Sequence, residues 1–262
     1  MATIGPHSDQ GAAHGNGGVR RSPAELAVAE DHEGWVSRSR VFLTPIAAPS
    51  IMGLFGFMIA TLMVGAWQAG WYGTAATPLL IWPLALFAGG ILQAVAAAAS
   101  LRARDGVAVA VHTAWGSFWI AWGVLQLVVT TGRLPLVPLG LANPSMAFWF
   151  IALTLVTIFA ALGALAQNMA IFSTLAVLTL ASAVTAAGEY AGSLATLRAG
   201  GWLFVISAVA AWLTAGAMML ENSFGRTIIP PSRWSRHPYV PGPRATDPLA
   251  YPAGMPGVRV GQ

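Results

Sequence analysis

Residues 146–187 read MAFWFIALTLVTIFAALGALAQNMAIFSTLAVLTLASAVTAA and contain no charged side chain. Apolar runs of roughly 20 residues, the length that a helix needs to cross a bilayer, lie on either side of a short polar break. The break is Ala166-Gln167-Asn168-Met169. The stretch therefore predicts two membrane-spanning helices joined as a tight hairpin.

The same composition extends over most of the chain. Apolar residues make up 56% of the sequence and charged residues only 8%, so that the solvent of this protein must be lipid. Between Ile46 and Leu220 there are six formal charges: Arg102, Arg104, Asp105, Arg133, Glu189 and Arg198. The sequence predicts an all-α integral membrane protein, a bundle of six transmembrane helices. The spans are expected at Pro49–Trp67, Pro78–Ala99, Ala108–Val129, Met146–Leu165, Ala170–Ala187 and Gly200–Leu220.

Two polar regions flank the six-helix transmembrane domain, which we place at residues 46–221. Residues 1–45 are polar and Gly-rich and lack an apolar segment, so no cleavable signal peptide is expected. Ser22-Pro23-Ala24-Glu25 fits a capping box, which leaves a short surface helix and an irregular tail as open alternatives. Residues 222–262 are rich in Arg, Pro and Gly and are expected to form a tail without regular structure.

The distribution of arginine predicts the orientation. The N-terminal region, the second-to-third loop and the C-terminal region hold four, two and five arginines, whereas the opposite loops hold none, one and one. By the positive-inside rule, both termini are expected in the cytoplasm of a multi-pass protein of the plasma (inner) membrane.

Several classes of function lack the residues that they need. The chain has no cysteine, and all thirteen of its basic residues are arginine, which excludes thiolate chemistry and a retinal Schiff base. His112 is the one histidine inside a span and cannot supply paired haem ligands. No protease motif is present. We therefore expect no enzyme, no cofactor, no metal site and no nucleic-acid partner.

The fifth span carries a polar stripe, since its polar residues recur at helical spacing on one face. The stripe consists of Thr174, Leu178, Ser182, Thr185 and Glu189. Such a face is costly against lipid and is expected to face the bundle or a water-filled path. Alternatively, the hydroxyls bond the carbonyls of their own helix, and Glu189 pairs with Arg198.

The third span has a comparable face, formed by His112, Trp115, Trp119, Trp122 and Gln126. These side chains are candidates to line a narrow passage, and Gln93 on the second span is a candidate pore donor. Alternatively, the tryptophans face lipid, His112 bonds a neighbouring carbonyl, and Gln93 joins two helices. Histidine titrates near ~6.5 in water, which makes His112 a candidate for proton coupling together with Glu189.

Two segments resemble a known family: TAWGSFW at residues 113–119 and FGRTIIP at residues 224–230. They resemble the T-S-Y-G-S-F-W and F-G-R-T-x-L-P segments of the acetate uptake transporter family, which includes bacterial acetate/succinate transporters and yeast acetate/ammonia-export relatives. Gly89-Gly90-x-x-Gln93 aligns as well. Two positions differ from the family pattern. Residues 46–51 read IAAPSI where the family has N-P-A-P-x-G, and Trp115 stands where relatives often have tyrosine.

The resemblance implies a homohexamer of six-helix protomers, each with one conducting path closed by three apolar side chains. Carried over by position, these are Phe55, Trp115 and Leu178. The polar lining is expected from Gln93, Thr174, Ser182, Thr185 and Gln126. Trp115 and Leu178 are also the centres of the two stripes identified above.

These observations favour a channel-like, proton-coupled transporter of acetate or similar small monocarboxylates, with succinate as a further candidate. Its partners would be the carboxylate, protons, the lipid bilayer and copies of the same chain. One alternative is a passive channel for a neutral solute such as urea or ammonia. Another is a non-transporting membrane sensor or assembly factor that uses its tails as docking sites.

Overall fold

The computed structural model describes residues 46–230 and 232. The expectations for residues 1–45 and for most of the C-terminal tail lie outside this part of the chain. All regular elements of the described part are helical, and six helices are long and apolar enough to cross a membrane. They are α2 (Pro49–Gln68), α3, η1 and α4 as one continuous span (Pro78–Ala103), α5 (Gly106–Thr130), α6 (Pro144–Ala164), α7 (Met169–Ala191) and α8 (Leu194–Phe224).

The prediction of six spans is confirmed, and their ends follow from local chemistry. Proline begins α2, the second span and α6, where its missing N–H costs nothing. The side chains of Asp105, Asn143, Asn168 and Ser193 accept a backbone N–H at the starts of α5 to α8. The last helix begins at Leu194 rather than Gly200, because Ser193 caps it and the glycines of its first turns are accommodated within the helix. Gly192, with φ of 64°, ends α7 in the left-handed turn that glycine favours.

The second span is irregular in its middle. α3 (Pro78–Leu84) contains Pro83, a π-helix, η1, follows at Ala85–Ile91, and α4 (Leu92–Ala103) completes the span. At Gly89 an added Cβ would lie 2.6 Å from Trp119 Cγ. The missing side chain therefore lets α5 approach the π-helix closely.

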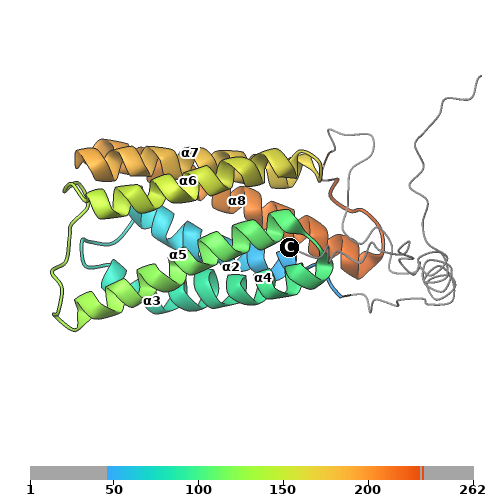
Figure 1. The fold of residues 1–262 in the computed structure, drawn as a ribbon, viewed down its shortest axis with the longest axis horizontal. Helices are drawn as coiled ribbons and strands as arrows, with labels where there is room; N and C mark the ends of the chain where they lie inside the picture. The colour runs from blue at the N-terminus through green and yellow to red at the C-terminus, as the bar shows by residue number, and fades with distance from the viewer. Residues whose placement is uncertain (1–45, 231, 233–262) are drawn as a thin grey trace, which may run out of the picture. The chain divides into compact units, whose positions relative to one another are not determined.

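The six spans lie side by side, and the described chain begins and ends at the same end of the bundle (Figure 1). We call this the terminal end; it also holds the α4–α5 and α6–α7 turns. The opposite loop end holds the connections at residues 69–77, 131–143 and 192–193. α7 packs between α6 and α8, and α2 packs against α8 on one side and η1, α4 and α5 on the other. Among the described helices, α5 and α7 are not backbone neighbours, so the space between them is filled by side chains.

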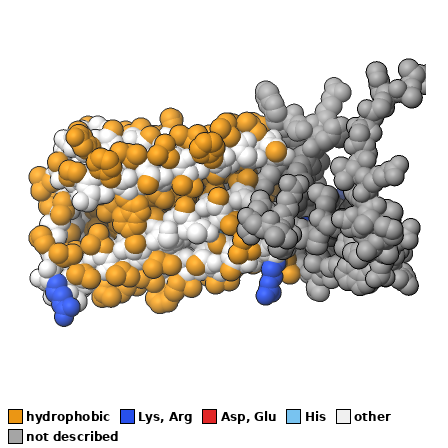
Figure 2. Space-filling view, in the orientation of Figure 1, with side chains coloured by type: hydrophobic (Ala, Val, Ile, Leu, Met, Phe, Trp, Pro, Cys, Tyr) orange, Lys and Arg blue, Asp and Glu red, His pale blue; other side chains and the backbone are white. Residues whose placement is uncertain are grey.

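The outer surface is apolar along the length of the bundle. Figure 2 shows hydrophobic side chains over the whole described face, with arginine side chains visible only near its two ends. Large apolar side chains such as Phe148, Phe159 and Trp212 are exposed. A water-soluble chain could not expose so much apolar surface, so these faces meet lipid or another subunit.

Candidate functional site

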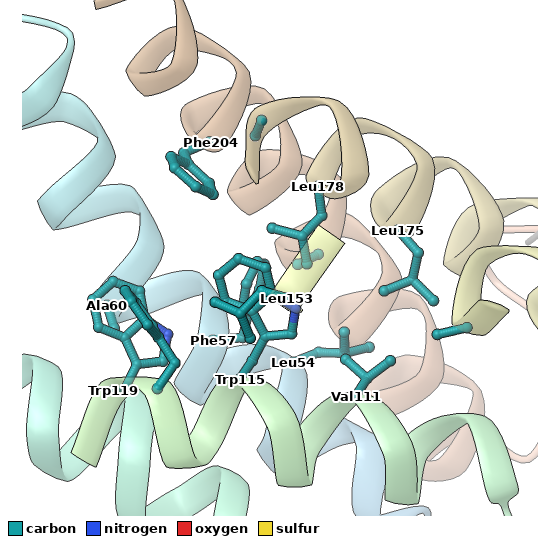
Figure 3. Packing of buried hydrophobic residues seen from close by; sticks show 14 of the residues in the cluster. Leu54, Phe57, Ala60, Val111, Trp115, Trp119, Leu153, Leu175, Leu178 and Phe204 are labelled. Carbon is teal, nitrogen blue, oxygen red and sulfur yellow. The ribbon is translucent and has the colours of Figure 1, made fainter. Parts of the chain in front are cut away.

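An apolar plug fills the centre of the bundle. We define the plug as Phe57 of α2, Trp115 of α5, Leu178 of α7 and Phe204 of α8, which belong to one buried cluster. Trp115 and Leu178 are each only 1% exposed. The ring centroid of Trp115 lies 6.0 Å from that of Phe57 and 6.1 Å from that of Phe204, both edge to face. Figure 3 shows Leu178 pointing from α7 toward Trp115.

The ring of Trp115 is held in place by a hydrogen bond to α6. Its Nε1 donates to Thr157 Oγ1 at 3.0 Å, and Thr157 donates in turn to the carbonyl of Leu153 at 2.6 Å. The indole N–H is therefore not available to a solute in this state. Trp119 and Trp122 are also buried, at 3% and 7% exposure, so the tryptophans of α5 do not face lipid in the protomer.

The structure brings Trp115 and Leu178 together, but it places Phe55 elsewhere. Phe55 is half-buried and packs at the edge of the cluster. Residues two apart on a helix point in different directions, so Phe57, which is 2% exposed, is the phenylalanine of α2 that contacts Trp115.

A cavity of about 290 Å³ opens at the loop end. We call it the loop-end cavity; its walls come from the end of α2, the loop after it, the α5–α6 loop and the start of α8. It is lined by Trp67, Gln68, Gly70, Tyr72, Gly73, Thr74, Ala75, Pro138, Leu139, Leu194 and Arg198. Arg198 is the one charged side chain among these described residues.

The wall of the loop-end cavity is fixed by hydrogen bonds from aromatic side chains. Trp67 Nε1 donates to the carbonyl of Thr74 at 2.8 Å, and the hydroxyl of Tyr72 donates to the carbonyl of Met63 at 2.7 Å. Burial raises the pKa of Tyr72 above its usual value, so the phenol stays neutral. The wall therefore adds no negative charge to the cavity.

Gln68 connects the loop-end cavity to the polar stripe of α7. Its side chain is 6% exposed, and its Nε2 donates to Thr185 Oγ1 at 3.1 Å and to the carbonyl of Leu197 at 2.8 Å. Because the carbonyl of Leu197 can only accept, this contact fixes which amide atom is the nitrogen. Thr185 accepts this bond, so its own hydrogen remains free to donate.

A second, much smaller pocket of about 20 Å³ lies at the terminal end. We call it the terminal-end pocket; it is lined by Ser50, Leu54, Asp105, Val107, Ala108, Val111, His112, Gln167, Ile171 and Leu175. One water molecule needs about 10–15 Å³ on this measure, so the pocket is closed to a carboxylate in this state. Gln167 Nε2 donates to Asp105 Oδ1 at 2.9 Å and ties the α6–α7 turn to the start of α5.

His112 and Gln93 meet beside this pocket, both fully enclosed by the protein. Gln93 Nε2 donates to the carbonyl of Gly89 at 2.7 Å, so its Oε1 faces His112 Nδ1, at 3.2 Å. An oxygen at Gln93 requires the hydrogen of a neutral imidazole to sit on Nδ1. His112 Nε2 is then the atom left to take up a proton. It lies over Gly53, where an added Cβ would be 2.4 Å away.

The remaining candidates are separated from this pair. Thr174 and Ser182 are buried but donate to the carbonyls of Ala170 and Leu178 in their own helix, both at 2.9 Å. Their hydroxyls can therefore accept hydrogen bonds but not donate them in this state. Gln126 is half-buried and lines neither cavity. Within the described part of the chain, no ion pair joins Glu189, at the loop end of α7, to Arg198.

Three residues of α2 were not predicted as site residues from the sequence: Phe57, Thr61 and Gln68. All three share one helical face, since they are spaced by four and seven residues. Thr61 is 1% exposed, and its Oγ1 has no hydrogen-bond partner among the described residues. Gln68 could have been identified from the sequence, because it is a polar residue at the end of a mostly apolar span.

A polar cavity at one end of a lipid-embedded bundle and a small pocket at the other, with an apolar plug between them, fit a membrane transporter or channel. Residues 37–233 match the model of the GPR1/FUN34/yaaH family. The chain belongs to this family.

Several similar proteins carry names that state what they transport. The succinate-acetate/proton symporter SatP of Escherichia coli K12 is 28% identical over 188 residues, which cover 71% of this chain and 96% of that protein. Ammonia transport outward protein 2 of Saccharomyces cerevisiae is 23% identical, over 68% of this chain and 64% of that protein. The solved structure of the bacterial acetate channel SatP superposes with a TM-score of 0.62 at 25% identity, over 72% of this chain and all of that one. The family resemblance inferred from residues 113–119 and 224–230 is confirmed.

Proposed function

We propose that the chain conducts acetate and similar small monocarboxylates across the inner membrane through a path within each protomer. The observation that carries the proposal is the position of the plug along the helices, between the loop-end cavity and the terminal-end pocket. The path would run from the loop-end cavity past Thr185, through the plug, to His112 and Gln93. SatP, similar in sequence and fold, is named as an acetate channel and as a succinate-acetate/proton symporter.

The plug would set the size limit of this path. Its side chains are apolar and offer no hydrogen bond to a solute, so a carboxylate crosses only when they move apart and the gap is wetted. Trp115 is larger than a tyrosine and uses its N–H on Thr157. We therefore rank acetate before succinate in the order of expected substrates.

Proton coupling would use His112. Protonation at Nε2 adds a positive charge beside the path, which attracts a carboxylate, and loss of the proton releases it. Glu189 is the second candidate, although it lies at the other end of its helix from the terminal-end pocket.

The proposal includes a homohexameric assembly and an orientation with both termini in the cytoplasm. The exposed apolar faces fit a homohexamer in lipid, as the resemblance implies. The arginine count supports a cytoplasmic position for both termini, with residues 1–45 and 222–262. The loop-end cavity would then open to the outside.

Uptake into liposomes tests the function. Purified protein is reconstituted, and labelled acetate is offered with and without an inward proton gradient. We expect acetate to accumulate above its external concentration only with the gradient. Equilibration without accumulation would instead indicate a channel. Uptake of urea or methylamine but not acetate would favour the alternative of a passive channel for a neutral solute.

A further inference from the structure

We propose that the loop-end cavity is an anion-capture site, in which the guanidinium of Arg198 binds the carboxylate of a small monocarboxylate before it reaches the plug. This inference rests on the proposed function and adds a binding step outside the plug. It assigns a role to a residue that the polar stripes do not include.

The guanidinium of Arg198 is free to take a ligand. It forms no hydrogen bond or ion pair with any residue in the described part of the chain, and Glu189, near the loop end of α7, does not line the cavity. Arg198 lies against the turn at Gly70, where an added Cβ would be 3.3 Å from its Nε. The missing side chain leaves this part of the cavity open. A planar guanidinium with several N–H donors matches a carboxylate through two parallel hydrogen bonds.

The rest of the cavity suits the apolar end of the same ligand. Trp67, Pro138, Leu139 and Leu194 supply an apolar wall, and the neutral phenol of Tyr72 adds no charge. The volume of about 290 Å³ is many times that of one water, so there is room for a short-chain acid and its solvent.

The floor of the cavity explains why the carboxylate should stay at Arg198. The side-chain nitrogen of Gln68 donates its two hydrogens to Thr185 and to the carbonyl of Leu197. The side-chain atom left for a ligand is therefore the acceptor Oε1. An acceptor disfavours a bare carboxylate. The next donors are the hydroxyls of Thr185 and Thr61, deeper along α7 and α2.

The charge count predicts the class of ligand. Arg198 is the single cation among the described residues that line the cavity, so a second carboxylate on the same ligand would be left unpaired. The site should therefore prefer monocarboxylates such as acetate and propionate to dicarboxylates of similar size such as malonate.

The test compares Arg198→Gln with Arg133→Gln, a second exposed arginine in a loop-end connection that does not line the cavity. We expect Arg198→Gln to raise the KM for acetate uptake about tenfold at low salt, as loss of one charge-assisted contact implies. The maximal rate should change little, Arg198→Lys should lie between, and Arg133→Gln should match the wild type. High salt should raise the wild-type KM toward that of Arg198→Gln. Equal KM values in all variants would overturn the proposal.

Two more measurements distinguish a bound carboxylate from a bound lipid phosphate at Arg198. Propionate should compete with acetate at least about fivefold better than malonate in the wild type, and this preference should shrink in Arg198→Gln. The KM difference should persist in liposomes of neutral phosphatidylcholine. A difference seen only with anionic phosphatidylglycerol would assign Arg198 to lipid phosphate and contradict the proposal.

A binding measurement distinguishes this inference from the proposed function. The line width of ¹³C-acetate is followed by NMR with the protein in nanodiscs. Broadening by the wild type that is lost in Arg198→Gln supports the site even if no acetate is transported. Equal broadening by both proteins overturns the site even if acetate is transported.

Discussion

The loop-end cavity and the terminal-end pocket differ in size, charge and hydrogen bonding. The first has a volume of about 290 Å³ and the second about 20 Å³. The first is lined by the cation of Arg198, which has no ion-pair partner among the described residues, whereas the second is lined mostly by apolar side chains, together with Asp105 and His112. At the terminal end the polar groups also bond one another, through Gln167 with Asp105 and Gln93 with His112.

This difference orders the steps of the proposed path. An anion would meet the positive charge of Arg198 at the loop end and would reach His112 only after the plug. Asp105 disfavours a carboxylate that rests at the terminal end, which favours its release there. In the proposed path, this structure would be a state that is open at the loop end and closed at the plug.

Truncation of the plug side chains should have the largest effect on substrate selection, because the loop-end cavity and the terminal-end pocket would then be joined. We expect Leu178→Ala and Trp115→Ala to raise succinate uptake relative to acetate about tenfold or more, since an apolar gate works through its width and dewetting. Relative uptake of labelled succinate and acetate in liposomes measures this change.

Leu197→Ala is the matched control for the plug. Leu197 is fully buried but packs against Gly188, outside the plug. Each leucine truncation should cost about 2–5 kcal/mol of stability, so that folding alone cannot explain a difference between them. The same substrate range in Leu178→Ala as in Leu197→Ala would show that Leu178 only packs the core.

Removing the titratable group at the terminal end should have the next largest effect. In the wild type, uptake should rise as external pH falls, because more protons would then reach His112 when the plug opens, and protonated His112 would attract the anion. His112→Gln keeps polarity but cannot titrate, so its pH profile should be flat, with uptake lowered several-fold under a proton gradient.

Glu189→Gln is the comparison for this experiment and should keep most of the pH dependence, since Glu189 lies far along the bundle from the terminal-end pocket. An unchanged profile with uphill uptake in His112→Gln would exclude the histidine as the coupling group. Coupling would then involve Glu189 or permeation of the protonated acid.

Gly53→Ala, at the terminal end, should change the pH dependence of uptake less than His112→Gln does. The added methyl group would overlap the ring of His112, so the ring must shift and its bond to Gln93 must weaken. We expect the uptake of this variant to lose part of its pH dependence.

Gly216→Ala is the control, because an added Cβ there meets no other atom within 4 Å. This variant should keep the wild-type transport rate, and its thermal unfolding temperature should be unchanged or slightly raised.

The smallest effect is expected at Phe55. The ring of Phe57 packs edge to face on Trp115, whereas Phe55 packs at the edge of the cluster. Phe57→Ala should therefore loosen size selection, while Phe55→Ala should change it less than about twofold. Succinate-to-acetate uptake ratios for the two variants decide which phenylalanine closes the path. A larger effect at Phe55 would support the position that the family resemblance implies.

The spans were predictable because a bilayer imposes one length and one composition on every helix. The hairpin at Gln167 and Asn168 followed from the short break between two apolar runs, and the stripes centred on Trp115 and Leu178 followed from helical periodicity. The π-helix after Pro83 and the extension of α8 to Leu194 did not, since both depend on caps and on contacts with neighbouring helices.

The partners of the polar residues were the least predictable part. Spacing placed Thr174 and Ser182 on one face, but only the geometry shows that their hydrogens are used within α7. Likewise, Gln68 and Arg198 become a site only when the ends of α2 and α8 meet. Sequence periodicity gives the direction of a side chain along its own helix, but not the atom opposite it.

Labelling of single cysteines tests the central claim most directly, because the chain has no cysteine of its own. Ala75→Cys would lie in the loop-end cavity and Ser50→Cys in the terminal-end pocket. In sealed vesicles, a charged impermeant thiol reagent added at the loop end should label Ala75→Cys, and acetate should slow this reaction. It should not label Ser50→Cys until Trp115→Ala is added. Labelling of Ser50→Cys with the plug intact, or no gain of labelling when Trp115 is removed, would contradict a path that runs through the plug.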